Sequence, residues 1–249
     1  MTKKLVYVDI GTHIGQEYKA LFVYSIWEFL FRFAKLFVAS CIFRKHKIIP
    51  LGLGEAIDII KHTRRIRQQK KNITSILVEP NTRLYRDDVY KTADKVFCIA
   101  LGDKEDGMYF SNLFFPNSNK VSQGASIFKN KKDIDLDESD TIVVCGCITF
   151  AEMLKESLDA RFGEGSYEVV IRVNCEGSED NAIYAFHKIF KNQFNVIFGS
   201  LKDVGELKGT AKMEALLTYI ESNNLKFVPF SPLYTTWKQA SREILDILK

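Results

Sequence analysis

Short runs of apolar, β-rich residues alternate with segments of helical periodicity along most of the 249-residue chain. The runs are apolar throughout, which is typical of strands that are buried on both faces. Strands of this kind joined by helices favour an α/β fold with a mainly parallel sheet. The expected strands cover residues 5–9, 73–79, 95–100, 141–145, 168–174, 195–198 and 227–230, and further extended pieces cover 108–115 and 125–128.

Helical periodicity fills the segments between these strands. A helical stretch over about 17–72, broken near residues 50–54, separates the first strand from the second. The acidic residues 133–140 are expected to form a loop. Because the chain shows no internal repeat and no long linker, we expect a single domain, 1–249, with the stretch 17–72 as a helical insertion. The other expected helices cover residues 84–93, 151–162 and 212–223 and the C-terminus.

The most hydrophobic stretch covers residues 20–43. Glu28, Arg32 and Lys35 interrupt it at spacings of four and three, which places the three charges on one helical face. Charges near the middle of a membrane span would cost several kcal/mol, so we expect a soluble or interfacial amphipathic helix that buries its aromatic face, and not a spanning helix.

The positive charge of the chain is concentrated in one segment. Lys and Arg number 35 against 31 Asp and Glu, a net charge of +4, whereas residues 44–71 alone carry nine Lys/Arg and two acids, a net charge of +7. Such a run is either a solvated helix face or a surface for an anionic partner, namely a phosphate-bearing substrate, acidic lipid headgroups or another subunit. Peripheral membrane binding or self-association is therefore expected through residues 20–71. Nucleic acid is not expected as a partner, because the basic run lacks interleaved aromatic residues.

The cysteines and the N-terminus indicate a cytoplasmic protein. Five cysteines form an odd and scattered set without zinc-site spacing, so we expect reduced, structural thiols. The N-terminal residues have two lysines but only a short apolar run before Asp9, which does not fit a signal peptide. The expected location is the cytoplasm, including the inner face of the membrane.

Polar residues follow three of the expected strands. Ligands of open α/β sheets bind beyond the carboxyl ends of the strands, so the segments 9–15, 79–81 and 174–179 form a candidate site. Gly11 and Gly15 allow a tight turn and the close approach of a ligand to the backbone. Glu79, at the end of the second strand, is placed to accept hydrogen bonds from ribose hydroxyls.

The order of five motifs resembles the FkbM-type methyltransferases, over about residues 1–16 and 73–200. The motifs are Val8-Asp-Ile-Gly-Thr-His-Ile-Gly-Gln16, Val78-Glu-Pro-Asn81, Ile99-Ala-Leu-Gly-Asp103, Gly124-Ala-Ser-Ile127 and Ile171-Arg-Val-Asn-Cys-Glu-Gly-Ser-Glu179. The resemblance implies a Rossmann-like class I methyltransferase sheet with helices on both faces. It also implies an S-adenosyl-L-methionine cofactor and a role in sugar or surface (capsular) polysaccharide biosynthesis.

Two departures from the family pattern affect the expected site. Thr12 and His13 replace an Ala-Asn pair, and Arg172 and Asn174 replace a Lys and an Asp. Asn174 keeps the hydrogen-bonding capacity of that Asp but cannot ionise, so the proton-transfer or metal-binding role that the family's Asp would have is not expected of it.

Carried over residue by residue, the resemblance implies a set of cofactor-binding residues. The turn after the first strand would hold the methionine part, Glu79 the ribose, and the end of the third strand the adenine. The implied cofactor-binding residues are Asp9, Gly11, Thr12, Gly15, Glu79, Asn81, Ala100, Asp103, Ser126 and Asn174. Glu176 and Glu179 match a motif that opens a helix, where they either orient the acceptor or cap the helix.

Methyl transfer to an oxygen needs alignment of the reacting atoms and benefits from a base. His13 and Glu176 are the candidate catalytic residues, and His13 is alternatively a loop histidine bonded to backbone. His187 is expected to be a packing or surface residue, and no ligand cluster indicates a metal. The acceptor would be a small molecule, namely a sugar, a nucleotide-linked sugar or a phosphorylated precursor.

Two alternatives of a different class remain at this point. A nicotinamide-dependent nucleotide-sugar enzyme is disfavoured because the glycine turn lacks Gly-x-Gly-x-x-Gly spacing. A non-catalytic module would bind a membrane or a partner protein through residues 20–71 and keep a vestigial nucleoside pocket.

Overall fold

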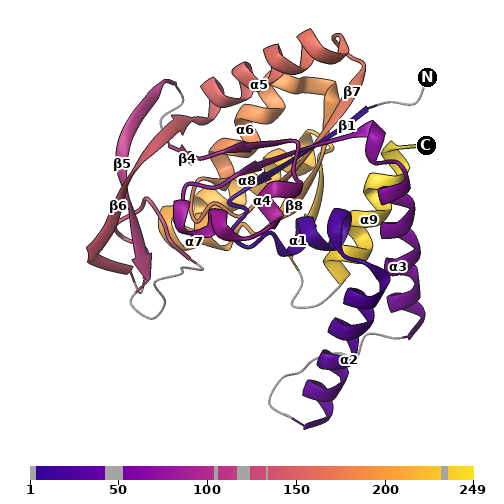
Figure 1. Ribbon diagram of the computed structural model, residues 1–249. Coiled ribbons are helices and arrows are strands. Elements are labelled where there is room, and N and C mark those ends of the chain that lie inside the picture. The colour runs from indigo at the N-terminus through magenta and orange to yellow at the C-terminus, as the bar shows by residue number, and fades with distance from the viewer. Residues whose placement is uncertain (1–3, 43–52, 104–105, 117–123, 133, 231–234) are drawn as a thin grey trace.

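The computed structural model describes residues 4–42, 53–103, 106–116, 124–132, 134–230 and 235–249 (Figure 1). Its main sheet has six strands, all parallel, in the order β3-β2-β1-β7-β8-β9. This confirms the expected α/β fold with a parallel sheet and is compatible with a Rossmann-like fold. The six strands are β1 (Lys4–Ile10), β2 (Ile73–Val78), β3 (Lys95–Phe97), β7 (Tyr167–Val173), β8 (Phe194–Gly199) and β9 (Lys226–Pro229).

Strand β1 lies at the centre of the sheet and sets the position of the candidate site. It pairs with β2 up to Ile10↔Val78 and with β7 up to Ile10↔Val173, so the three strands end side by side. The chain order reverses between β1 and β7, and this switch point is where doubly wound sheets bind their ligands. The residues that follow β1, β2 and β7 therefore meet at one edge of the sheet.

Helices cover both faces of the sheet, as expected (Figure 1). Val6, Val8 and Ile10 of β1 belong to a core cluster with α5, α6 and α8 on one face. Leu5 and Tyr7 belong to a second cluster with α1, α3 and α9 on the other face. Successive strand residues point to opposite faces, so one apolar strand supplies both cores. The helices are α1 (Gln16–Tyr18), α3 (Leu53–Gln68), α5 (Cys147–Phe162), α6 (Glu179–Phe190), α7 (Lys202–Lys208), α8 (Thr210–Ser222) and α9 (Thr235–Ile247).

The helical stretch between β1 and β2 is confirmed, but most of it is part of the core. Tyr18 of α1, Leu21 and Phe22 of the π-helical turn η1 (Lys19–Val23), and Ile66 of α3 are all buried against the sheet. Only α2 (Ile26–Ile42) projects from the body of the molecule (Figure 1). The expected break near residues 50–54 lies mostly outside the described residues.

A second, three-stranded sheet was not predicted. It has the order β4-β6-β5, with β4 (Ala100–Gly102) parallel and β5 (Met108–Pro116) antiparallel to β6 (Ile134–Gly146). The prediction of one continuous strand over residues 95–100 is therefore wrong. This segment is divided into β3, which pairs with β2 only as far as Val78, and β4, which turns away to pair with β6.

Two further expectations in this region are wrong. Residues 134–140, expected as part of a loop, form the first half of β6 and pair with β5. Their acids are accommodated because this half is partly exposed, and Arg83 forms ion pairs with Glu138 and Asp140. Residues 125–128 form no strand, and only Ser126 makes an isolated bridge to Phe114.

The segment 84–93 was expected to be one helix and is instead two short turns. A 3-10 helix, η3 (Thr82–Arg86), is followed by α4 (Val89–Thr92). The Asn81 side chain accepts a hydrogen bond from Arg83 N at the start of η3. The break between the two turns places Tyr85 and Tyr90 with stacked rings, 4.6 Å between centroids.

Among the described residues, no helix is both long and apolar enough to cross a membrane.

Candidate functional site

A cavity lies at the carboxyl ends of β1, β2 and β7 and encloses about 950 Å³ of space, including open solvent. The loop after each strand forms part of its wall, and residues 99–101 and 124–127 close another side. Eight of the twelve sequence-predicted catalytic and cofactor-binding residues line it, namely Gly11, Thr12, His13, Glu79, Ala100, Ser126, Asn174 and Glu176. Asp9, Gly15, Asn81 and Asp103 are not among the lining residues.

The turn after β1 requires both of its glycines. Gly11 has φ of 72°, and a Cβ there would lie 2.1 Å from the Asn174 carbonyl oxygen. Gly15 has φ of 62°, and its Cβ would lie 2.7 Å from a methyl group of Val89. The Thr12 hydroxyl donates to the Asp9 carbonyl at 2.9 Å and closes the turn. Gly11 therefore allows the turn after β1 to lie close to the loop after β7 beside the cavity. Gly15 allows the turn to pack closely against Val89.

Glu79 joins the glycine turn to the end of β2. One carboxylate oxygen accepts from His13 N at 2.8 Å and the other from Asn81 N at 2.9 Å. The side chain is buried, which raises the pKa of Glu79, and the two backbone N–H groups oppose that rise. Each oxygen can accept more than one hydrogen bond, so both keep acceptor capacity toward the cavity.

Arg172 on β7 is a site residue for which the sequence analysis assigned no role. Its guanidinium pairs with Asp9 at 3.2 Å and with Glu17 at 3.1 Å, and it also donates to the Gly11 carbonyl. Phe230 covers it, with the ring centroid 5.0 Å from Cζ. Burial raises the pKa of Asp9 to about 7, and Arg172 opposes that rise. An arginine inside an otherwise apolar strand needs a buried partner, which is the signal that could have revealed this pair.

His13 lines the cavity with positive φ, 51°. Tyr90 donates a hydrogen bond to the His13 carbonyl, and Tyr85 donates to the Glu79 carbonyl at 2.7 Å. Burial and then Arg172 lower the pKa of His13, so its imidazole is neutral at neutral pH. Its Nε2 is buried and has no hydrogen-bond partner within the described part of the chain. The neutral ring therefore has an unused hydrogen-bonding nitrogen in the wall of the cavity.

Glu176, the other predicted catalytic residue, is already engaged. Its carboxylate forms an ion pair with Lys131, and Asn174 donates to it at 3.5 Å. Its carbonyl accepts from the Ser126 hydroxyl at 2.9 Å, which ties the loop 124–127 to the loop after β7. Burial lowers the pKa of Lys131, and Asp203 opposes that effect.

Glu179 supports the loop after β7 and does not face an acceptor. Its two oxygens accept from Cys175 N and Gly177 N, each at 2.9 Å. The residue is fully buried, and burial raises its pKa to about 7. The sequence analysis gave Glu179 two possible roles, orienting the acceptor and capping the helix. The structure shows a third one, since Glu179 holds the loop that precedes α6, and the N-cap of α6, Ser178, has no side-chain cap hydrogen bond.

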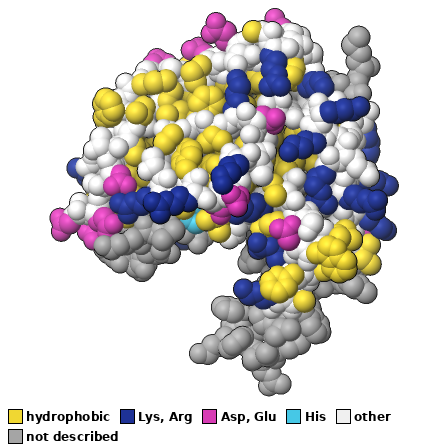
Figure 2. All heavy atoms as spheres, in the orientation of Figure 1, with side chains coloured by type: hydrophobic (Ala, Val, Ile, Leu, Met, Phe, Trp, Pro, Cys, Tyr) yellow, Lys and Arg dark blue, Asp and Glu magenta, His cyan; other side chains and the backbone are white. Residues whose placement is uncertain are grey.

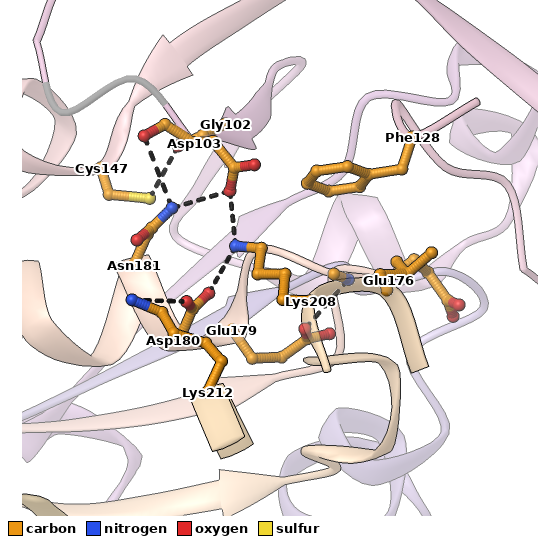
Figure 3. Close-up of polar contacts among 12 residues, drawn as sticks. Gly102, Asp103, Phe128, Cys147, Glu176, Glu179, Asp180, Asn181, Lys208 and Lys212 are labelled. Carbon is orange, nitrogen blue, oxygen red and sulfur yellow. Dashed lines mark hydrogen bonds and ion pairs between the residues drawn. The ribbon is translucent and has the colours of Figure 1, made fainter. Parts of the chain in front are cut away.

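Asp103 does not line the cavity, and Figure 3 shows its carboxylate beside Asn181 and Lys208. Its carboxylate accepts from Asn181 at 2.7 Å and pairs with Lys208 at 2.6 Å. Lys208 also pairs with Asp180 at 2.7 Å, so one ammonium group joins β4 to α6 and α7. The predicted contact of Asp103 with adenine is not supported by this geometry. Asn81 is also absent from the cavity wall, and it is buried and caps η3.

No group of His, Cys, Asp and Glu side chains in the described ranges could hold a metal ion. Cys98, Cys145, Cys147 and Cys175 are free thiols, and the side chain of Cys41 lies outside the description. His187 packs in α6, with Nδ1 2.6 Å from the Tyr219 hydroxyl, as expected for a packing residue.

Comparison of the chain with protein-family models, with curated proteins and with solved structures found no match. What the fold and the site define is an α/β protein whose parallel sheet carries a polar cavity at its switch point.

Proposed function

We propose that this protein is an S-adenosyl-L-methionine-dependent O-methyltransferase of the FkbM type. One observation carries the proposal: each of the five motif segments that resemble the family contributes residues to the wall of a single cavity. Gly11 and Glu176 are 165 residues apart in sequence, and both line it, together with Glu79 and Ala100. The convergence of distant motif residues on one space supports a shared ligand.

The cavity offers each part of the cofactor a matching surface. Glu79 retains acceptor capacity for ribose hydroxyls, because each oxygen holds only one backbone N–H. Ile99, Ala100 and Leu101 offer an apolar wall for adenine, and the turn at Gly11 offers close backbone approach to the methionine part. The bound cofactor would supply an electrophilic methyl group.

The protein must then orient the acceptor oxygen, exclude water and take up its proton. His13 is the proposed base, because it lines the cavity as a neutral imidazole with an unpartnered Nε2. Glu176 is better suited to positioning, because proton uptake would compete with its Lys131 ion pair. The proposed acceptor is a hydroxyl of a sugar, a nucleotide-linked sugar or a phosphorylated precursor of a surface polysaccharide. We place the reaction in the cytoplasm, in keeping with the free thiols of the described cysteines.

The nicotinamide alternative has one observation in its favour, the strand order, which is also that of dinucleotide-binding sheets. A pyrophosphate, however, binds at the N-terminus of a helix that follows Gly-x-Gly-x-x-Gly. Here Gly11 and Gly15 are followed by only three α-helical residues and then a π-helical turn. The local geometry therefore favours a nucleoside without a pyrophosphate.

Calorimetry with S-adenosylhomocysteine tests the proposal. Glu79→Gln removes a charged acceptor, and a hydrogen bond to a charged group contributes about 1.5–3 kcal/mol, so binding should weaken about 10- to 100-fold. Asp103→Asn is the matched control, since this acid also follows a strand but faces Lys208, and its affinity should equal that of the wild type.

A second variant keeps the test valid if Glu79→Gln loses stability. Ala100→Leu adds bulk to the apolar wall without removing a polar contact and should abolish binding while the protein stays folded by circular dichroism. No binding by the folded wild type would overturn the proposal. Saturable quenching of NADH fluorescence in its place would favour the nicotinamide alternative, and binding of neither would favour a non-catalytic module.

A further inference from the structure

Helix α2 presents three distinct faces. Phe29 is fully buried, and Phe33 is half-buried beside it, against Ile59 of α3 and Trp237 of α9. Glu28, Arg32 and Lys35 occupy a charged face, as the sequence predicted. The third face is apolar and exposed, so the fold buries only part of the aromatic side of this helix.

The exposed apolar face is a continuous stripe. Trp27 is 77% exposed and Phe31 72%, and Ile26 and Leu30 are close to half exposed. These positions, at spacings of one and four, lie on neighbouring turns of one side of the helix. Large apolar side chains grouped in this way mark an interaction surface, whereas single ones do not.

Uncompensated positive charge lies next to this stripe, on α3, which packs against α2. Helix α3 itself contains four Lys/Arg and two acids, a net charge of +2, and the two lysines that follow it, Lys70 and Lys71, raise the net charge of residues 53–71 to +4. Lys61, Arg64 and Arg65 are exposed, and within the described part of the chain none of them forms an ion pair. Figure 2 shows hydrophobic side chains beside a band of Lys and Arg on the flank formed by α2 and α3.

We propose that this flank docks on an anionic lipid bilayer, with the α2 stripe inserted at the headgroup level and the α3 basic residues against the lipid phosphates. Trp and Phe on one side and Lys and Arg beside them are the pattern of interfacial helices. The positive charge of α3 favours a lipid bilayer with anionic headgroups as the binding partner of this flank, because the two charges are complementary. The inference does not depend on the proposed enzymatic function.

A second copy of this chain fits the flank less well. A symmetric dimer places the same patch against itself, which would bring two like-charged α3 helices together. A membrane span is also not the basis of the proposal, since no described helix is long and apolar enough. The proposed contact is peripheral and reversible.

Cosedimentation of the full chain with lipid vesicles tests the inference. The vesicles are phosphatidylcholine alone or with about one third phosphatidylglycerol. The wild type should bind the anionic vesicles and bind the neutral ones much more weakly, and added salt should weaken the binding.

Two variants separate the apolar and the charged contributions. Trp27→Ser with Phe31→Ser should weaken binding by more than about 100-fold, because two large side chains lose their burial. Lys61→Gln with Arg64→Gln and Arg65→Gln should weaken binding to anionic vesicles about 100-fold. Phe110→Ser, at a position 78% exposed on β5, is the matched control and should bind as the wild type does.

Fluorescence gives a readout of the contact itself. The chain has two tryptophans, so in Trp237→Phe the emission comes from Trp27 alone. Anionic vesicles should shift this emission to shorter wavelength and protect it from acrylamide. Absence of vesicle binding would overturn the proposal, as would binding that the α2 variant leaves unchanged. Lipid-free self-association that the α2 variant abolishes would identify a second copy as the occupant instead.

Discussion

The carboxylates at or near the strand ends fall into two groups, which differ in the kind of partner that each carboxylate has. Asp9 and Asp103 pair with the cations Arg172 and Lys208, which come from elements distant in sequence. Glu79 and Glu179 accept hydrogen bonds from backbone N–H groups of loops close to the cavity. A cation occupies the carboxylate and ties elements together, whereas two N–H groups orient it and leave lone pairs free. A carboxylate that follows a strand can therefore bind a ligand only when it does not already form an ion pair.

The largest expected effect tests the cation-paired acids. Arg172→Met leaves Asp9 buried without its partner, and breaking a buried pair costs about 3–5 kcal/mol of the free energy of unfolding. Urea unfolding at about pH 8, above the pKa of Asp9 in the wild type, measures the loss. Adding Asp9→Asn to the variant should restore at least part of the stability. If Arg172→Met alone were as stable as the wild type, the ion pair would not stabilise Asp9, and the two kinds of carboxylate would not differ in this way.

A smaller effect tests the acids held by backbone groups. Glu179 titrates from about 4.5 when unfolded but at about 7 in the fold, so the folded state binds the extra proton between these values. Stability is then highest below the unfolded pKa and falls as the pH rises through 7, by about 3 kcal/mol for this group.

The matching measurement is the free energy of unfolding as a function of pH. Glu179→Gln should flatten the fall between about pH 5 and 8, and Asp9, with the same sign of shift, should account for the part that remains. An unchanged slope in the variant would show that Glu179 is ionised throughout.

The smallest effect sharpens the contrast between Asp103 and Glu79. Asp103 is part of the ion-pair group in Figure 3, but its side chain is 44% exposed. Asp103→Asn should therefore cost less than about 1 kcal/mol in thermal unfolding. If this substitution lowered the affinity for S-adenosylhomocysteine, Asp103 would contact the ligand, which would contradict its position outside the cavity wall.

Much of the fold could be predicted because strands buried on both faces carry a local signal. The apolar runs around Val6, Ile76 and Val170 identified β1, β2 and β7, and the sheet confirmed them. The first half of β6 was missed because its acids are satisfied by Arg83, a partner more than fifty residues away. The exposed face of α2 was also missed, since periodicity locates an apolar side but not whether another element covers it.

The sequence by itself determined that parallel strands end in a glycine turn and a carboxylate, because apolar runs and the freedom of Gly11 act within a few residues. Only the tertiary structure decided that Glu79 faces the cavity, that Asp103 faces Lys208 and that Arg172 lies beneath the turn. The physical reason is that a carboxylate takes its role from the partners within hydrogen-bonding distance. Those partners come from strands and helices that only folding brings together.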